Sequence, residues 1–323
     1  MTFHPDADQR ALIEDAFSRP LDELLPLARL HAAEAAEPWE AIAGLGIFGV
    51  AADPDIGGVG LGPVEEALVA MELGRRLAGA QILTTLMAYH CADEALRARL
   101  VTGEARVAPA TLTGGSLCVI DGDGADHVLL RRDGRASLVP IGALADRKTV
   151  DDHHWTATLA DAGQAPAGLV WADDVALTRV RLIEAAALSG MAACATTMAV
   201  DYAKLREQFG HAIGGFQAVK HQCANMAMAA MAARDQTSFA SVALEQGRAD
   251  AAFQVESALL LAIDAALANS RRNVQVHGGI GFSEEADPHL VVKRAHLLIE
   301  AAGGADAAAD RVAGAEAAMI RQG

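Results

Sequence analysis

The sequence predicts a mainly α-helical protein with a small β domain in its middle, because the spacing of apolar residues changes twice along the 323-residue chain. Residues 1–110 and 178–323 carry apolar side chains three and four positions apart, which is the spacing of one helical face. Residues 111–177 instead hold short β-type runs separated by glycine-containing turns. We therefore predict an N-terminal helical domain, a middle β domain and a C-terminal four-helix bundle.

The N-terminal part should begin with a long helix followed by a short one. Helical spacing predicts a helix over 21–36, and Gly46 should end a short helix over Trp39–Leu45. The segment from Gly46 to Gly62 is too rich in glycine to be anything but a loop. Pro63 then opens the next helix, because the first helical position tolerates proline.

The middle part reads as a small β domain. Arg132-Asp133-Gly134 is typical of a hairpin turn between two strands. Apolar and β-branched residues predict strands over Leu117–Ile120, His127–Arg131, Ala136–Ile141, Thr156–Leu159 and Gly168–Trp171.

The C-terminal part should be helical from Arg181 onward. A second helix is expected to open at Phe216, a third to cover Phe253–Val276 and a fourth to cover Leu290–Glu300. Such a bundle could hold a di-iron centre only with paired E-x-x-H motifs facing inward, and none of these helices contains one. A short alanine-rich tail helix should follow the fourth.

Composition and charge narrow the classes of function. The formal net charge of -16 argues against nucleic-acid binding and against adsorption to an anionic membrane. We see no cationic leader and no uninterrupted apolar run long enough to span a bilayer. The four cysteines are isolated and read as reduced thiols, so we expect a cytoplasmic protein. His153 and His154 could be half of a metal site, but no partner cluster has ligand spacing.

The stretch Tyr202–Gln217 is the most distinctive of the chain. We expect a helix that carries Arg206 and Gln208 near its C-terminal end and is broken by Gly210. A guanidinium, an amide and the Phe209 ring at such a corner could grip a flat, phosphate-bearing ligand. The same residues could equally form an ordinary helix C-terminus with a glycine stop and a dipole-compensating cation.

Two motifs in this part resemble those of the acyl-CoA dehydrogenase family. The first is Arg206-Glu-Gln-Phe-Gly210 followed by Phe216-Gln217, and the second is Gln275-Val-His-Gly-Gly-Ile-Gly-Phe282. The resemblance covers roughly residues 21–110 and 179–302, with a weaker and shortened match between them. It implies the family architecture of a helical N-domain, a shortened β domain and a C-terminal bundle.

The resemblance also implies a cofactor and a reaction. FAD would be held in a site shared with a neighbouring subunit, and the substrate would be an acyl-CoA thioester that loses hydrogens from its α and β carbons. Electron-transfer flavoprotein is the expected electron acceptor. By resemblance, the residues that contact the pyrophosphate and adenosine side of FAD are Arg206, Gln208, Phe209, Gln217, Gln275, Gly278 and Gly279.

The catalytic base of the family has no aligned counterpart in this chain. Most members place a glutamate just after the last bundle helix, where this sequence has Ala302, and a minority place it at Val180. Glu184 and Glu300 are the nearest carboxylates, and each could serve only with a local shift of the backbone. We expect Glu184 to be a solvated first-turn residue and Glu300 an exposed residue at a helix end.

Another departure from the family lies before the middle domain, where the usual Pro-x-x-Gly-Ser-Asp loop is absent and Gly114-Gly115 stands instead. Together these features resemble the shorter, base-lacking subunit of heteromeric acyl-CoA dehydrogenases that act on steroid side-chain CoA esters. Three hypotheses remain open. In the first, the chain completes the FAD site of a catalytic partner. In the second, it is a self-sufficient acyl-CoA dehydrogenase that uses Glu184 or Glu300 as its base in fatty acid or steroid side-chain β-oxidation. In the third, it is a flavin-free helical scaffold. The first two allow a homo- or hetero-oligomer.

Overall fold

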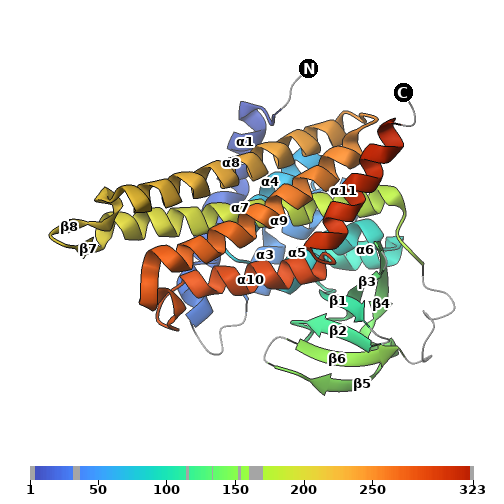
Figure 1. The fold of residues 1–323 in the computed structure, drawn as a ribbon. Coiled ribbons are helices and arrows are strands. Elements are labelled where there is room, and N and C mark those ends of the chain that lie inside the picture. Colours follow the sequence, from blue (N-terminus) through green and yellow to red (C-terminus); the bar gives the residue numbers. More distant parts are fainter. Residues whose placement is uncertain are drawn as a thin grey trace.

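The computed structural model confirms the predicted fold class, with a small sheet packed below one end of a helical body (Figure 1). It describes residues 4–320 apart from 32–36, 114–115, 133, 152–153 and 160–169. The α-helices are α1 (Ala7–Ile13), α2 (Arg19–Leu24), α3 (Trp39–Gly44), α4 (Pro63–Arg75), α5 (Ala80–Ala88), α6 (Glu94–Val101), α7 (Asp174–Leu205), α8 (Gln217–Glu245), α9 (Ala251–His277), α10 (Pro288–Ala301) and α11 (Ala305–Ile320).

The first predicted helix is shorter than the periodicity indicated. Helix α2 ends at Leu24, and a 3₁₀ turn over Leu27–His31 replaces the continuation expected up to residue 36. Pro26 explains the break, because proline lacks an N–H donor and its ring clashes with the preceding helical turn. The end of the predicted helix, 32–36, lies outside the described residues. The short helix before Gly46 and the helix opened by Pro63 are confirmed.

The middle part forms one six-stranded sheet in the order β4-β3-β1-β2-β6-β5. Its strands are β1 (Val107–Thr113), β2 (Ser116–Ile120), β3 (His127–Arg132), β4 (Arg135–Pro140), β5 (Leu144–Thr149) and β6 (His154–Leu159). Only β1 and β3 pair in parallel, and the other neighbouring strands pair antiparallel. The predicted Gly168–Trp171 strand is reduced to a single bridge between Trp171 and Ser137: Val170 is not in a strand, and residues 168–169 lie outside the described residues.

Two strands had no clear signal in the sequence. The central strand β1 contains Pro109, which normally excludes a central position, but the antiparallel ladder with β2 begins only at Ala110. The edge strand β5 has four exposed residues at its end, so it shows no alternation of apolar and polar side chains. Both strands were therefore missing from the prediction.

The C-terminal bundle begins earlier than predicted. The Asp173 carboxylate accepts a hydrogen bond from the backbone N–H of Ala176 at 2.8 Å, so α7 starts at Asp174 rather than near Arg181. This helix packs on α4, α8 and α9 in the centre of the molecule (Figure 1). Met226 and Ala230 of α8 are buried in this core.

Two glycines let α4 and α7 approach closely. A Cβ atom added to Gly190 would lie 2.1 Å from the carbonyl oxygen of Met71, and one added to Gly74 would lie 2.0 Å from that of Ala187. Real Cβ atoms do not approach a backbone oxygen so closely, so the crossing requires glycine at both positions. This contact joins the N-terminal helices to the bundle.

Two helical stretches among the described residues are long and apolar enough to cross a membrane by length and composition alone. They are Asp174–Leu205, whose most apolar window is 72% buried inside the protein, and Ala251–Phe282, whose window is 50% buried. Both take part in the packed bundle, and the core helix of a globular protein has the same length and hydropathy.

Candidate functional site

The first motif forms a tight corner at the far end of the bundle, between α7 and α8 (Figure 1). We expected Gly210 to break the helix, but α7 already ends at Leu205, and Arg206 has an extended backbone. Residues 207–208 (β7) and 211–212 (β8) pair as a small hairpin. Phe209 and Gly210 form its turn with φ angles of +55° and +85°, a pair of left-handed residues that suits a two-residue hairpin.

The second motif ends α9 beside this corner. The helix stops at His277, because Gly278 adopts a φ of +66° that other residues rarely adopt. A 3₁₀ turn over Gly278–Phe282 follows. A Cβ atom added to Gly279 would meet no atom within 4 Å, so its backbone borders open space.

The two motifs share one pocket of about 350 Å³. Tyr202 and His277 both line it, and their rings stack on each other with centroids 4.0 Å apart. The structure therefore brings together three of the predicted site residues, Arg206, Gln208 and Gly279. The pocket is lined by these three and by Tyr202, Ile213, Val276, His277 and Ile280.

The other predicted residues lie near this pocket but do not line it. Phe209 is 90% exposed at the tip of the hairpin, and its ring meets Phe216 edge-on at 6.1 Å. Gln217 is exposed at the start of α8, while Gln275 and Gly278 are exposed at the end of α9. Sequence reasoning missed Tyr202 and His277, although the latter lies inside the second motif.

The pocket is suited to a flat, phosphate-bearing ligand. Within the described part of the chain, the Arg206 side chain has no ion pair or hydrogen bond, so its guanidinium fork is available to an oxygen pair. The side-chain nitrogen of Gln208 donates a hydrogen bond to the Glu207 carbonyl at 2.9 Å. The side-chain oxygen of Gln208 takes no part in that hydrogen bond. Burial lowers the pKa of His277, which keeps the stacked ring neutral near pH 7.

Large apolar side chains surround this pocket and face outward. Phe209 belongs to the first motif, Ile280 and Phe282 belong to the second, and Leu205 directly precedes the first; all four are exposed. Exposed apolar residues gathered at one place are typical of a protein–protein contact surface. We refer to these four residues as the apolar rim.

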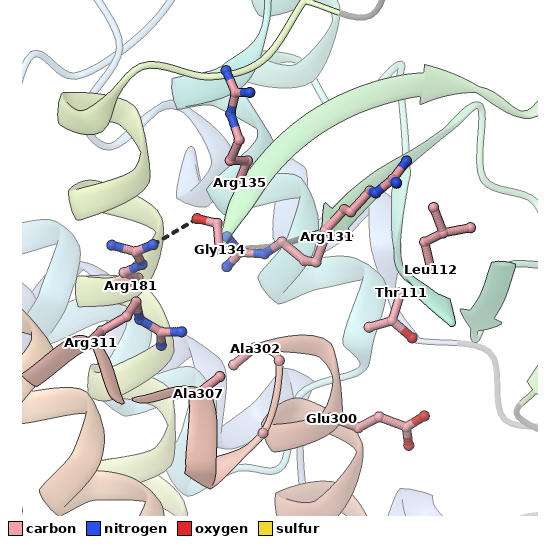
Figure 2. A pocket seen from close by; sticks show the side chains of 13 residues that line it. Thr111, Leu112, Arg131, Gly134, Arg135, Arg181, Glu300, Ala302, Ala307 and Arg311 are labelled. Atoms are coloured by element: carbon pink, nitrogen blue, oxygen red, sulfur yellow. Dashed lines mark hydrogen bonds between the residues drawn. The ribbon is translucent and has the colours of Figure 1, made fainter. Parts of the chain in front are cut away.

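A second, larger pocket of about 470 Å³ lies between the sheet and the bundle (Figure 2). Thr111 and Leu112 of β1 face it from the sheet, and Glu300 and Ala302 face it from the end of α10. Five arginines also line it, which the sequence did not indicate because they are scattered along the chain. They are Arg131, Arg132, Arg135, Arg181 and Arg311.

The structure places no carboxylate at the aligned base positions. Val180 is fully buried in α7, and Ala302 lines the larger pocket. The expectation of a solvated, first-turn Glu184 is wrong, because α7 begins ten residues earlier and the side chain is only 2% exposed. Glu184 accepts an ion-pairing hydrogen bond from Arg131. Glu300 is at a helix end and 49% exposed, as expected.

No group of three or more potential metal ligands occurs among the described residues. His154 pairs with the Asp151 carboxylate at 2.8 Å, and His153 lies outside the described residues. We therefore assign no metal to this segment.

Comparison with known families identifies the chain. The acyl-CoA dehydrogenase N-terminal domain matches residues 6–106, and the acyl-CoA dehydrogenase C-terminal domain matches residues 167–316. The chain belongs to the acyl-CoA dehydrogenase family. Members of this family are FAD-binding flavoproteins. The C-terminal match contains both motifs and therefore the whole of the smaller pocket.

Individual relatives agree with this assignment. The acyl-CoA dehydrogenase FadE34 of Mycobacterium tuberculosis is 34% identical over 89% of this chain, and the chain spans only 44% of the length of FadE34. The acyl-CoA dehydrogenase IpdE2 of the same organism is 31% identical over 75% of this chain and 74% of its own length. Among solved structures, the ChsE4-ChsE5 complex from Mycobacterium tuberculosis has a similar fold. The match has a TM-score of 0.78 and 23% identity and covers 98% of this chain and 99% of the other chain.

Proposed function

We propose that this chain completes the FAD site of a catalytic partner subunit in a heteromeric acyl-CoA dehydrogenase. The complex would remove hydrogens from the α and β carbons of an acyl-CoA thioester in the cytoplasm. Electron-transfer flavoprotein would accept the electrons. The observation that supports this proposal most is the smaller pocket, where Arg206, Gln208 and Gly279 lie together and none of the described lining residues is a carboxylate.

The residues of this pocket fit the phosphate-bearing half of FAD. Arg206 would hold pyrophosphate oxygens through its fork, and the side-chain-free Gly279 would let the ligand approach the backbone. Gln208 and the exposed Phe209 would contact the adenosine side. When bound, FAD accepts the hydride that leaves the β carbon of the substrate.

The apolar rim supports a subunit contact at this same place. A pocket at the tip of a monomer encloses little of a large ligand, so a second subunit is needed to cover the remainder. Leu205, Phe209, Ile280 and Phe282 would pack on that partner and exclude water from the cofactor. The fold likeness to a chain of the ChsE4-ChsE5 complex agrees with assembly from two different chains.

The positions of the carboxylates support a partner that supplies the base. A general base must come within hydrogen-bonding reach of the proton that it removes. Val180 and Ala302 cannot accept a proton, and Glu184 is buried against Arg131. The α proton would therefore be taken by a carboxylate of the partner.

A second candidate function is a self-sufficient acyl-CoA dehydrogenase with Glu300 as the base. One observation favours it, because Glu300 is half-exposed and lines the larger pocket together with Ala302. Visible absorption spectra distinguish the two candidates. Bound flavin and activity in the chain alone would support self-sufficiency, whereas flavin only after mixing with a co-encoded partner would support the shared site. If no flavin is bound under either condition, both candidates are contradicted and the flavin-free helical scaffold is the hypothesis that remains.

Arg206 provides the sharpest test of the shared site. A charge-assisted bidentate contact contributes about 1.5–3 kcal/mol, so Arg206→Ala should weaken FAD retention in the complex roughly ten- to a hundredfold. Arg206→Lys should also weaken it, because the charge remains but the planar fork is lost. Arg19→Ala, at an exposed site on α2, is the matched control. Flavin retention equal to that of the parent in both Arg206 variants would remove Arg206 from the site.

A further inference from the structure

His277 lies at the end of α9, in the smaller pocket where the two motifs meet. Its ring stacks on Tyr202, with centroids 4.0 Å apart, and both residues line the pocket together with Arg206. We propose that His277 Nε2 accepts a hydrogen bond from the adenosine half of FAD, given either by the amino group of the base or by a ribose hydroxyl. This inference rests on the shared FAD site proposed above, and it assigns a role to a residue that the motif resemblance did not include.

The hydrogen bond at Nδ1 fixes which nitrogen of the ring carries the hydrogen. His277 Nδ1 lies 2.9 Å from the carbonyl oxygen of Asn273, one turn earlier in α9. A carbonyl oxygen can only accept a hydrogen bond, so Nδ1 must be the protonated nitrogen. In a neutral imidazole the other nitrogen then carries no hydrogen. Nε2 is therefore an acceptor at this position.

The ring is neutral near pH 7, so Nε2 keeps its lone pair. Burial lowers the pKa of His277 and outweighs two opposing effects, the hydrogen bond to the Asn273 carbonyl and the charge of Asp287. The Asp287 carboxylate is in turn paired with His31 Nε2 at 2.5 Å, which balances its charge when His31 is protonated. Protonation of Nε2 would also add a like charge to the pocket that Arg206 lines.

Nε2 is open to a ligand. It makes no hydrogen bond within the described part of the chain, yet it is not one of the buried unpaired atoms found there, so solvent reaches it. The turn that follows leaves space, because Cβ atoms added to Gly278 and Gly279 would meet no atom within 4 Å. The Tyr202 stack and the Nδ1 hydrogen bond hold the ring in place, and a side chain ordered before binding loses less entropy when the ligand arrives.

The hydrogen-bonding groups of the pocket indicate which part of the cofactor meets His277. Arg206 carries donors only, which suit the pyrophosphate oxygens. An acceptor such as Nε2 would repel those oxygens, and it is matched instead by N–H and O–H groups. In the phosphate-bearing half of FAD these groups are the adenine amino group and the ribose hydroxyls.

The tautomer can be tested on the full chain alone by nitrogen-15 NMR of labelled histidine at pH 7. The His277 signals, assigned by their loss in His277→Phe, should show hydrogen on Nδ1 and none on Nε2. A ring that carries its hydrogen on Nε2, or that is fully protonated at this pH, would overturn the proposal. This readout does not require FAD or a partner subunit.

Flavin retention in the assembled complex tests the contact itself. His277→Phe keeps an aromatic ring next to Tyr202 but removes the acceptor, so FAD binding should weaken roughly three- to tenfold. His289→Phe is the matched control. His289 Nδ1 also lies against a backbone carbonyl, that of Ala286 at 2.7 Å, but the residue does not line the pocket, so retention should stay unchanged. Thermal unfolding checks that both variants are folded.

Two FAD analogues separate the possible donors. Hypoxanthine in place of adenine lacks the amino group, and a dideoxyribose in place of the adenosine ribose lacks the hydroxyls. The parent complex should bind one of the two analogues roughly three- to tenfold more weakly than FAD. The His277→Phe complex should bind that analogue and FAD equally well, because the acceptor is already missing. Equal binding of all three by the parent, or an undiminished difference in His277→Phe, would overturn the proposal.

Arg206→Ala, measured beside these variants, separates failure of this inference from failure of the shared site. Weaker retention in Arg206→Ala but not in His277→Phe would overturn the role of His277 alone. Retention equal to that of the parent in both variants would overturn the shared site and this inference with it. Weaker retention in both variants, with His289→Phe unchanged, would support the assignment of His277 as a cofactor-binding residue.

Discussion

At the scale of single residues, the proposed cofactor site depends on a backbone position that carries no side chain. Gly279 borders open space in the smaller pocket, and its φ is not in the left-handed region. A larger residue can therefore be accommodated by the chain itself. A larger side chain would, however, block a ligand that approaches the backbone at this position.

This leads to a prediction for Gly279→Val. The variant should fold normally but bind FAD in the assembled complex at least tenfold more weakly, because a branched side chain would occupy the place of the phosphate. Gly44→Val is the matched control, since Gly44 also has open space and no left-handed φ. Flavin titrations measure both. Equal titrations would exclude the second motif from the site.

Glu184 and Glu300 differ in their surroundings and should respond differently to the change to glutamine. Glu184→Gln leaves Arg131 without its counter-charge, so the free energy of unfolding should fall by roughly 1–3 kcal/mol. Glu300 lies at an exposed helix end, so Glu300→Gln should change the free energy of unfolding by less than about 0.5 kcal/mol. Chemical denaturation of the two variants measures both effects.

Turnover provides the second readout for these variants. In the assembled complex, each variant should stay within about threefold of the parent, a change of under about 0.7 kcal/mol in the barrier. A loss of several orders of magnitude in kcat for Glu300→Gln, with flavin still bound, would show that this chain supplies its own base. The shared-site proposal would then be wrong.

At the scale of elements, the crossing of α4 over α7 leaves no room for a side chain at either of its glycines. Gly190→Ala would place a methyl group against the Met71 carbonyl and should lower the free energy of unfolding by about 1–3 kcal/mol. Gly314→Ala, in helix α11 with open space around it, should instead stabilise slightly, because alanine favours a helix. Thermal unfolding of both variants is the measurement. Similar melting temperatures would show that the crossing can relax.

At the scale of the whole molecule, an ion pair ties the N-terminal segment to the bundle. His31 Nε2 lies 2.5 Å from the Asp287 carboxylate, and His31 Nδ1 donates to the Glu284 carbonyl at 2.9 Å. Both nitrogens carry hydrogen only in the charged ring. The hydrogen bond to Asp287 is the main reason that the pKa of His31 is raised above its usual 6.5.

A raised pKa in the folded state means that the His31 contribution to stability is fully present below the unfolded value and is lost as pH rises through the folded value. His31→Gln should therefore destabilise the protein more at pH 5.5 than at pH 8.5. His296→Gln, at an exposed position of α10, is the control and should show the same small effect at both pH values. A destabilisation by His31→Gln that does not change with pH would contradict the ion pair.

The sequence by itself determined the fold class, the two motifs and the absence of a base at the aligned positions. These features depend on local spacing, on glycine and proline, and on short runs such as Arg206–Gly210, all of which are readable along the chain. The helix end at Leu205 was not readable, because the hairpin that follows it forms by pairing between strands. The same holds for β1, whose place in the sheet depends on two distant neighbours.

Only the tertiary structure decided which polar residues meet. Helical position alone made Glu184 look solvated, but Arg131 from another element covers it. The arginine-lined pocket gathers side chains from β3, β4, α7 and α11, and no regular spacing in the sequence could indicate that they converge. Periodicity reports which face of an element is buried, whereas the packing of distant elements decides what each buried face contacts.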